Sequence, residues 1–196
     1  EALRDGLLAV SGELNPQAGG PGFVPTVSAE ALEGLSKKGA TWNASPVEEQ
    51  HRRSIYMFTR RSLLLPLMTV FDQADTTQPC AQRSVTTVAP QALALLNNQF
   101  VHEQSDAFAR RVEREAGAEP AAQIDRAWWL AFGRAPSESE REMALAHLAA
   151  QREHYVTRGS EQAAAGAPDQ NAVNTADVAE HLALASLAHV LLNANE

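Results

Sequence analysis

The feature that most constrains the fold is the helical spacing of apolar residues that begins at Pro90. Proline is favoured at the start of a helix, and apolar side chains then recur on one face until Gly117, at Leu93, Leu96, Phe100, Phe108 and Val112. A pattern with this period and length is typical of an amphipathic helix that packs on a core. The sequence therefore predicts helical structure from Pro90 onward.

Start and stop signals divide the rest of this half into further helices. One helix is predicted over 121–132, ending at Gly133, and the next begins with a Ser-Glu-Ser-Glu capping box at Ser137 and reaches about Thr157. A last apolar helix is predicted after a cap at Thr175, and it should be buried on most sides. These segments place the chain in the mainly α class.

The first half of the chain has a less regular pattern. A helix is predicted to end near Gly12, followed by a loop rich in glycine and proline, an extended stretch over 23–27 and a short helix over 28–35. A second capping box at Ser45, with proline next to it, predicts another helix start. A leucine-rich helix over 62–71 is expected to be interrupted at Pro66.

Residues 53–61 are ambiguous between helix and strand. Their β-branched and aromatic residues favour a short strand, which could pair with the β-prone segment 84–88. A helix begun at Ser45 could also run through them, and we favour the strand. The fold predicted for 1–196 is one mainly α domain of about six helices with long loops and room for one short β-hairpin.

Two further expectations concern the organisation of the chain. Residues 159–174, rich in Ala, Gly, Gln and Asn, read as a flexible insertion because they hold almost no large apolar side chains. Helical spacing begins at the first residues without an N-cap and continues to the last residues without a stop signal, so both ends look like cuts through a longer chain.

Composition argues against several classes of partner. The formal net charge of −8 and pI near 5.3 disfavour nucleic acid, since proteins that grip phosphate backbones usually present a basic face. No apolar run approaches the roughly 20 residues of a membrane-spanning helix. The single cysteine, Cys80, cannot form an internal disulfide.

The best candidate for a binding site is a group of arginines and aspartates in the first half, comprising Arg52, Arg53, Arg60, Arg61, Asp72, Asp75 and Arg83. The guanidinium groups could form a pocket for sulfate, a carboxylate or a haem propionate. Alternatively they could tie an irregular loop to the helices. We favour this second interpretation, which predicts a buried ion pair between Arg53, Arg60, Arg61 or Arg83 and one of the two aspartates.

Two other readings of this segment stay open. Asp72 and Asp75 resemble an acid–base pair by residue type, although their spacing favours one loop turn that caps the backbone or accepts from arginine. Cys80 could be a reactive thiol because Arg83 would lower its pKa, but a buried inert cysteine is the commoner outcome.

The remaining candidates are weaker. His147 and His154 lie two turns apart on one predicted helix, which is wider than the spacing of helical metal ligands, so a solvated face is favoured and no metal site is expected. His181 and His189 fall on an apolar helix and are expected to be satisfied core residues. The pair Trp128-Trp129 is expected to lie in the core, although an exposed tryptophan could stack on a sugar.

Several short motifs occur in an order that resembles one known family. They are Arg53-Ser54-Ile55-Tyr56, Arg60-Arg61-Ser62, Phe71-Asp72, Asp75, Cys80, Arg83, Pro90-Gln91-Ala92-Leu93, Leu96-Asn97, Ala131-Phe132-Gly133-Arg134 and Leu191-Leu192-Asn193-Ala194-Asn195-Glu196. Together they resemble the domain of unknown function that ends large planctomycete-type proteins carrying cytochrome-c-like domains. The resemblance covers nearly the whole chain apart from the 159–174 segment.

The resemblance implies an exported protein, at the periplasm or the cell surface, with a haem-binding domain upstream of this chain. No Cys-x-x-Cys-His motif occurs here, so haem c is expected only in that upstream domain and no cofactor is expected in this segment.

No activity comes with the family, which leaves three hypotheses about function. The leading one is a non-catalytic module that packs against the upstream domains. The second is binding or processing of an anionic polysaccharide through the arginine cluster, and the third is a docking surface for a cytochrome domain.

Overall fold

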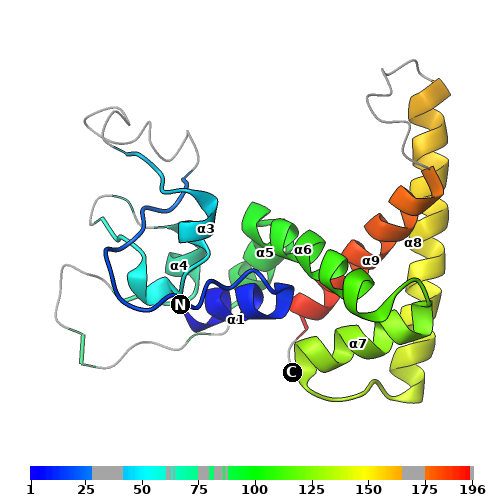
Figure 1. The fold of residues 1–196 in the computed structure, drawn as a ribbon, viewed down its shortest axis with the longest axis horizontal. Coiled ribbons are helices and arrows are strands. Elements are labelled where there is room, and N and C mark those ends of the chain that lie inside the picture. The colour runs from blue at the N-terminus through cyan, green and yellow to red at the C-terminus, as the bar shows by residue number, and fades with distance from the viewer. Residues whose placement is uncertain are drawn as a thin grey trace. The chain divides into compact units, whose positions relative to one another are not determined.

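The computed structural model describes residues 1–27, 42–60, 63, 65–74, 80–81, 86, 88–164 and 175–194. Within these ranges the protein folds into eight α-helices and one 3-10 helix, and its β-structure is limited to isolated bridges (Figure 1). The predicted mainly α class is confirmed. The chain divides into two compact units, which we call unit 1 (Glu1–Ala9 and Glu13–Asn98) and unit 2 (Val10–Gly12 and Gln99–Glu196).

The first helix, α1 (Ala2–Ser11), ends where the sequence predicted. Gly12 follows it with a φ of +84°, in the left-handed region that glycine adopts without steric cost. Leu7 and Leu8 of this helix are buried. The spacing of apolar residues near the start of the chain therefore identified a true helix.

The other helices of unit 1 are short. They are α3 (Val47–Gln50), the 3-10 helix η1 (Ser54–Tyr56), α4 (Pro66–Val70) and α5 (Ala89–Asn97). The predicted capping box at Ser45 is wrong, because Pro46 is the N-cap of α3 and the Ser45 hydroxyl accepts a hydrogen bond from Val24 N instead. Pro66 does not interrupt a longer helix, because α4 begins at this residue.

The strand favoured over 53–61 is also wrong in its described part, where η1 replaces it. The cause is a tertiary contact that overrides the β propensity. The Phe23 amide donates to Tyr56 O at 2.9 Å and the Phe58 amide donates to Phe23 O at 2.8 Å, so a single parallel bridge forms between Phe23 and Met57. Arg61 and most of the segment 84–88 lie outside the described residues.

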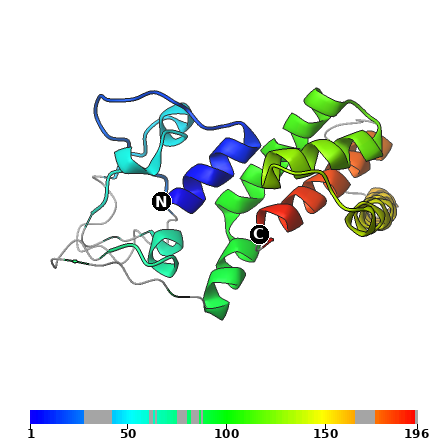
Figure 2. The same cartoon turned by 90° about the horizontal axis from the view of Figure 1, so that it is seen from below.

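Four longer helices make up unit 2, namely α6 (Gln99–Ala116), α7 (Pro120–Phe132), α8 (Glu138–Ala164) and α9 (Thr175–Leu192). α9 packs against α6, α7 and α8. In the view of Figure 2, α8 is seen nearly end-on at one side of this unit. Asn98 adopts an extended conformation, which divides the predicted helix from Pro90 to Gly117 into α5 and α6.

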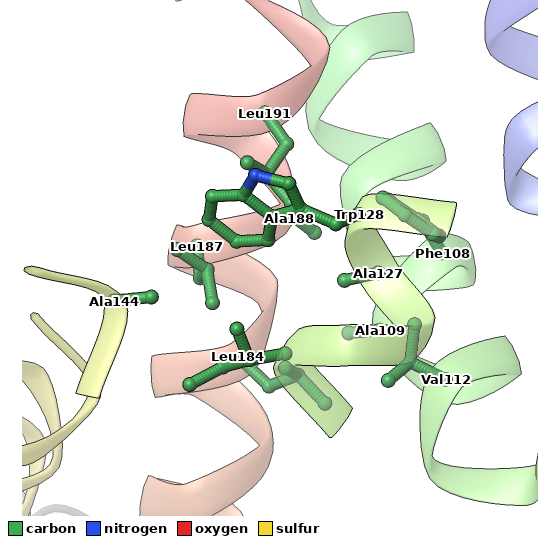
Figure 3. Packing of buried hydrophobic residues seen from close by; sticks show 11 residues of the cluster. Phe108, Ala109, Val112, Ala127, Trp128, Ala144, Leu184, Leu187, Ala188 and Leu191 are labelled. Atoms are coloured by element: carbon green, nitrogen blue, oxygen red, sulfur yellow. The ribbon is translucent and has the colours of Figure 1, made fainter. Parts of the chain in front are cut away.

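Unit 2 has a continuous apolar core (Figure 3). α9 contributes Leu184, Leu187, Ala188 and Leu191, which belong to the same cluster as Trp128 of α7 and the buried apolar side chains of α6. Burial of large apolar side chains is the main favourable term in folding, at about 25 cal/mol per Å². This core therefore supplies the principal stabilisation of unit 2.

Local signals fix the ends of the helices around this core. Gly133 ends α7 in a left-handed conformation with a φ of +70°, as predicted. The predicted capping box at Ser137 is present, because Ser137 N donates to Glu140 Oε2 at 2.6 Å and Glu140 N donates to Ser137 Oγ at 3.3 Å. Arg134 donates to both carboxylate oxygens of Glu140 and, with this capping contact, holds the pKa of that carboxyl well below its usual range.

Two helix boundaries differ from the prediction. α8 continues beyond Thr157 to Ala164, because the alanine-rich residues after Gly159 extend a helix already formed. Residues 165–174 of the predicted insertion lie outside the described part of the chain. Thr175 is the first residue of α9. Among the described residues, no helix combines the length and the apolar character needed to cross a membrane.

Candidate functional site

The side chain of Arg52 forms the centre of the polar cluster in unit 1, and only 1% of it is exposed. Its guanidinium group donates to three backbone carbonyls of the glycine-rich loop. Nη1 lies 2.8 Å from Pro21 O, Nε lies 3.4 Å from Gln17 O, and Nη2 donates to Gly19 O. The carboxylate of Glu49 lies 3.4 Å from Nη1 and supplies a partly exposed counter-charge. Arg52 therefore fastens the loop to the rest of the unit.

The ring of Tyr56 covers the guanidinium group of Arg52 from one side. Arg52 Cζ lies 4.2 Å from the centroid of the ring, a cation–π contact. The Tyr56 hydroxyl accepts a hydrogen bond of 2.8 Å from Gly19 N in the same loop. The loop comes so close here that a Cβ on Gly22 would lie 2.7 Å from Tyr56 O. Glycine is required at this position by contact with the backbone.

A second arginine, Arg4 of α1, is buried beside the first. Its Nη1 donates to Arg52 O at 3.0 Å and to Ser54 Oγ at 3.2 Å, and its Nη2 donates to Gln50 O. Burial lowers the pKa of Arg4, and the charge of Asp5 offsets part of this effect. Arg4 and Arg52 thus direct their donors mainly at the protein's own backbone, Arg4 at carbonyls at the end of α3 and Arg52 at carbonyls of the loop.

The carboxylate at the centre of this network is Asp5. Its Oδ1 accepts hydrogen bonds from Ser54 N and Ser54 Oγ, both at 2.7 Å. It lies 3.7 Å from Nη1 of Arg4, and its Oδ2 lies 3.8 Å from Nε of Arg53. Arg53 is 64% exposed, so this pair is screened by solvent. Arg53, one of the four arginines predicted to pair with Asp72 or Asp75, thus contacts a carboxylate on α1.

Asp72 has the loop-capping role that was one of its predicted alternatives. Its φ is +55°, and its Oδ2 accepts hydrogen bonds from Thr86 N and Thr86 Oγ1, both at 2.8 Å. Asparagine and aspartate tolerate this left-handed conformation better than other non-glycine residues. Arg60 is half-buried and takes part in an isolated antiparallel bridge with Leu63.

The other predicted site residues are not all brought to this cluster. Cys80 is exposed, so its interpretation as a buried cysteine is wrong. Arg61, Asp75 and Arg83 lie outside the described residues, and their predicted roles stay predictions.

Arg4 and Asp5 were missed because they lie almost 50 residues before their partners in the chain. A signal for Arg4 does exist in the sequence. It occupies the same helix face as Leu8 and Ser11, at spacings of four and seven residues, and all three are buried. A charged residue on the buried face of a helix requires a partner, but the sequence does not indicate which one.

The histidines and tryptophans of unit 2 lie away from the arginine cluster in the sequence. His147 Nε2 lies 3.1 Å from Ser186 Oγ, and burial lowers the pKa of this half-buried histidine, so the predicted solvated face is right only for His154. Trp128 is buried as predicted, whereas its neighbour Trp129 is exposed. Among the described residues, no group of three or more potential ligands is arranged to hold a metal ion.

The arrangement in unit 1 is that of a structural polar network. The donors of its two buried arginines face carbonyl oxygens, a serine hydroxyl and carboxylates of the same unit. Residues 1–148 match the family PSD1, described as protein of unknown function (DUF1553). The match covers most of the 196 residues, and the chain belongs to this family. No curated protein and no solved structure matches it.

Proposed function

We propose that this chain is a non-catalytic interaction module at the C-terminal end of a large exported protein, where it packs against upstream domains that include a cytochrome-c-like domain. The order of the motifs between Arg53 and Asn97 supports this placement, together with membership of the family. In this proposal haem c belongs to the upstream domain, and the chain supplies a surface for assembly.

The observation that carries the proposal is the exposed apolar face of α5. Leu93 and Leu96 lie three residues apart on this helix and are 58% and 48% exposed. α5 has no charged residue and contributes no buried residue. Adjacent apolar side chains at this spacing are typical of a helix that docks on another protein, and the cores of protein interfaces are depleted in charge.

The arginine network supports the non-catalytic part of the proposal. An anion pocket needs guanidinium donors that converge on a ligand. The donors of Arg52 and Arg4 instead converge on backbone carbonyls, with Arg52 almost wholly buried. The described contacts of the network therefore serve the internal structure of unit 1.

A binding measurement with the upstream region of the natural protein tests this proposal. The upstream region is titrated into the chain, first unmodified and then as the double variant Leu93→Ser/Leu96→Ser. We expect binding of the unmodified chain and at least about a tenfold loss in the double variant, because apolar anchors dominate interface energies. The melting temperature should change little, since both side chains are exposed.

A control variant and a second ligand show whether binding depends on the exposed face of α5. Ile55→Ser changes another exposed apolar residue of unit 1, on η1, and should leave the affinity unchanged. Titration with heparin, a sulfated glycan, tests the carbohydrate alternative. Micromolar heparin binding that is lost in Arg53→Ala and Arg60→Ala, without binding of the upstream region, would refute the proposal in favour of glycan recognition.

A further inference from the structure

Unit 2 contains a histidine whose two ring nitrogens both contact carboxylates of a neighbouring helix. His181 of α9 places Nε2 2.8 Å from Asp106 Oδ1 and Nδ1 2.9 Å from Glu113 Oε1, both on α6. An ionised carboxylate only accepts hydrogen bonds. Both ring nitrogens must therefore carry a proton for the two contacts to form, which makes the ring a charged imidazolium.

Other charged groups near this contact lie on α6, α8 and α9. On α6, Arg110 Nη2 lies 2.6 Å from Asp106 Oδ2, so it holds that carboxylate on the side away from the histidine. On α9, the residue before His181 is Glu180, which pairs with Arg152 of α8 at 2.9 Å. Glu180 thus has its own cationic partner. Of these charged groups, Asp106 and Glu113 are the two that contact the imidazole of His181 directly.

We propose that the Asp106–His181–Glu113 contact is a pH-sensitive clamp, which holds the C-terminal helix α9 on α6 while the imidazole is protonated and weakens when it loses its proton. A neutral imidazole can donate from only one nitrogen, so one carboxylate would then face a lone pair instead of a donor. The contact would change from two charge-assisted hydrogen bonds to one bond and one repulsive contact.

The direction of the pH effect follows from the contacts of His181. Burial lowers its pKa, but the hydrogen bonds to Asp106 and Glu113 outweigh burial, and the pKa is raised above the ordinary 6.5. A histidine with a raised pKa in the folded state stabilises the fold fully below pH 6.5, and this contribution is lost as the pH rises through the higher folded value. Each unit of difference corresponds to about a tenfold change in the folding equilibrium.

The clamp acts on the helix that completes the core of unit 2. α9 carries Leu184, Leu187 and Leu191 into the apolar cluster, one to three turns after His181. Loss of the clamp would therefore weaken the attachment of the helix that covers the core. The expected consequence is that His181 contributes more to the stability of unit 2 at pH 6 than at pH 8.5.

The experiment follows the His181 ring and the stability of the chain in parallel. NMR titration of the full 196-residue chain should show a midpoint for His181 above the ordinary value of 6.5. Asp106→Asn and Glu113→Gln should each lower the titration midpoint of His181. Melting temperatures are compared at pH 6 and pH 8.5: relative to His181→Gln, the unmodified chain should be less stable at pH 8.5 than at pH 6 by a few degrees.

His154→Gln is the matched control, because His154 is an exposed histidine whose ring contacts the neighbouring Tyr155. This variant should keep the pH dependence of the unmodified chain. A His181 midpoint at or below 6.5 would overturn the proposal, as would an equal pH dependence in His181→Gln and the unmodified chain. The NMR titration of the unmodified chain decides the matter even if a variant does not fold.

Discussion

Each of the two units is stabilised internally by a different kind of interaction. Unit 2 consists of four helices of 13 to 27 residues around a continuous apolar core. The described helices of unit 1 have at most 10 residues, two of them only four and five, and the largest fully buried side chain among its described residues is Arg52. Short helices leave most of their backbone groups without partners inside the helix, so buried donors are needed to satisfy them. Unit 1 uses guanidinium groups where unit 2 uses apolar packing.

The largest effect is expected from truncating the core of unit 2. Trp128→Ala should lower the free energy of unfolding by about 3–5 kcal/mol, because it leaves a cavity among side chains of α6, α7 and α9. Thermal or urea unfolding measures this loss. Trp129→Ala, at the next residue, removes an exposed ring and should cost less than about 1 kcal/mol. Equal losses in the two variants would show that this core is wrongly placed.

The corresponding change in unit 1 is Arg52→Met, which keeps an unbranched side chain but removes the charge and the donors. We expect a loss of about 2–3 kcal/mol, because the hydrogen bonds from the buried guanidinium group to the carbonyls of the glycine-rich loop are lost. Arg53→Met is the matched control and should change stability by less than about 0.5 kcal/mol, since Arg53 is mostly exposed. A tolerated Arg52→Met, measured by urea unfolding, would contradict the structural role of the network.

A smaller effect of the same kind is expected from Gly22→Ala. The added Cβ would lie 2.7 Å from Tyr56 O, a backbone atom that cannot rotate away, so we expect a loss of about 1–3 kcal/mol. Gly6→Ala has the opposite expectation, because Gly6 lies inside α1 with no atom within 4 Å of the new Cβ. It should stabilise the protein by roughly 0.5–1 kcal/mol. Changes of the same sign in the two melting temperatures would refute the close approach of the loop.

The smallest effect concerns a helix start in unit 2. Ser137→Ala removes the hydroxyl that accepts from Glu140 N and should cost about 1 kcal/mol, as for other N-cap residues. Thr157→Ala removes a hydroxyl that donates to a carbonyl within α8 and should have a smaller effect. Melting curves of the two variants test this order. A larger loss in Thr157→Ala would mean that the capping box is not what fixes this end of the helix.

The same difference between the units determines what the sequence could predict. The helices of unit 2 were predicted well because the signals that define them are local and agree with the packing. These signals are the helical spacing of apolar residues, the glycines that end helices and the capping box at Ser137. In unit 1 the strand favoured near Tyr56 was wrong, and the parallel bridge that forms beside it joins Phe23 to Met57, 34 residues away in the sequence. Of the arginines singled out as a group, Arg52 and Arg53 lie in the described network, but the roles of Arg52 and Asp5 depend on contacts between distant segments, which no local pattern encodes.

The central claim is that the buried arginines of unit 1 hold the protein's own backbone, and amide hydrogen exchange of Arg52→Met tests it most directly. The amides of Gly19, Phe23 and Phe58 donate hydrogen bonds in and beside the loop that Arg52 fastens. The account predicts faster exchange at these three amides, with protection of α6 and α9 unchanged and no effect in Arg53→Met. Unchanged protection at all three amides in Arg52→Met would contradict it.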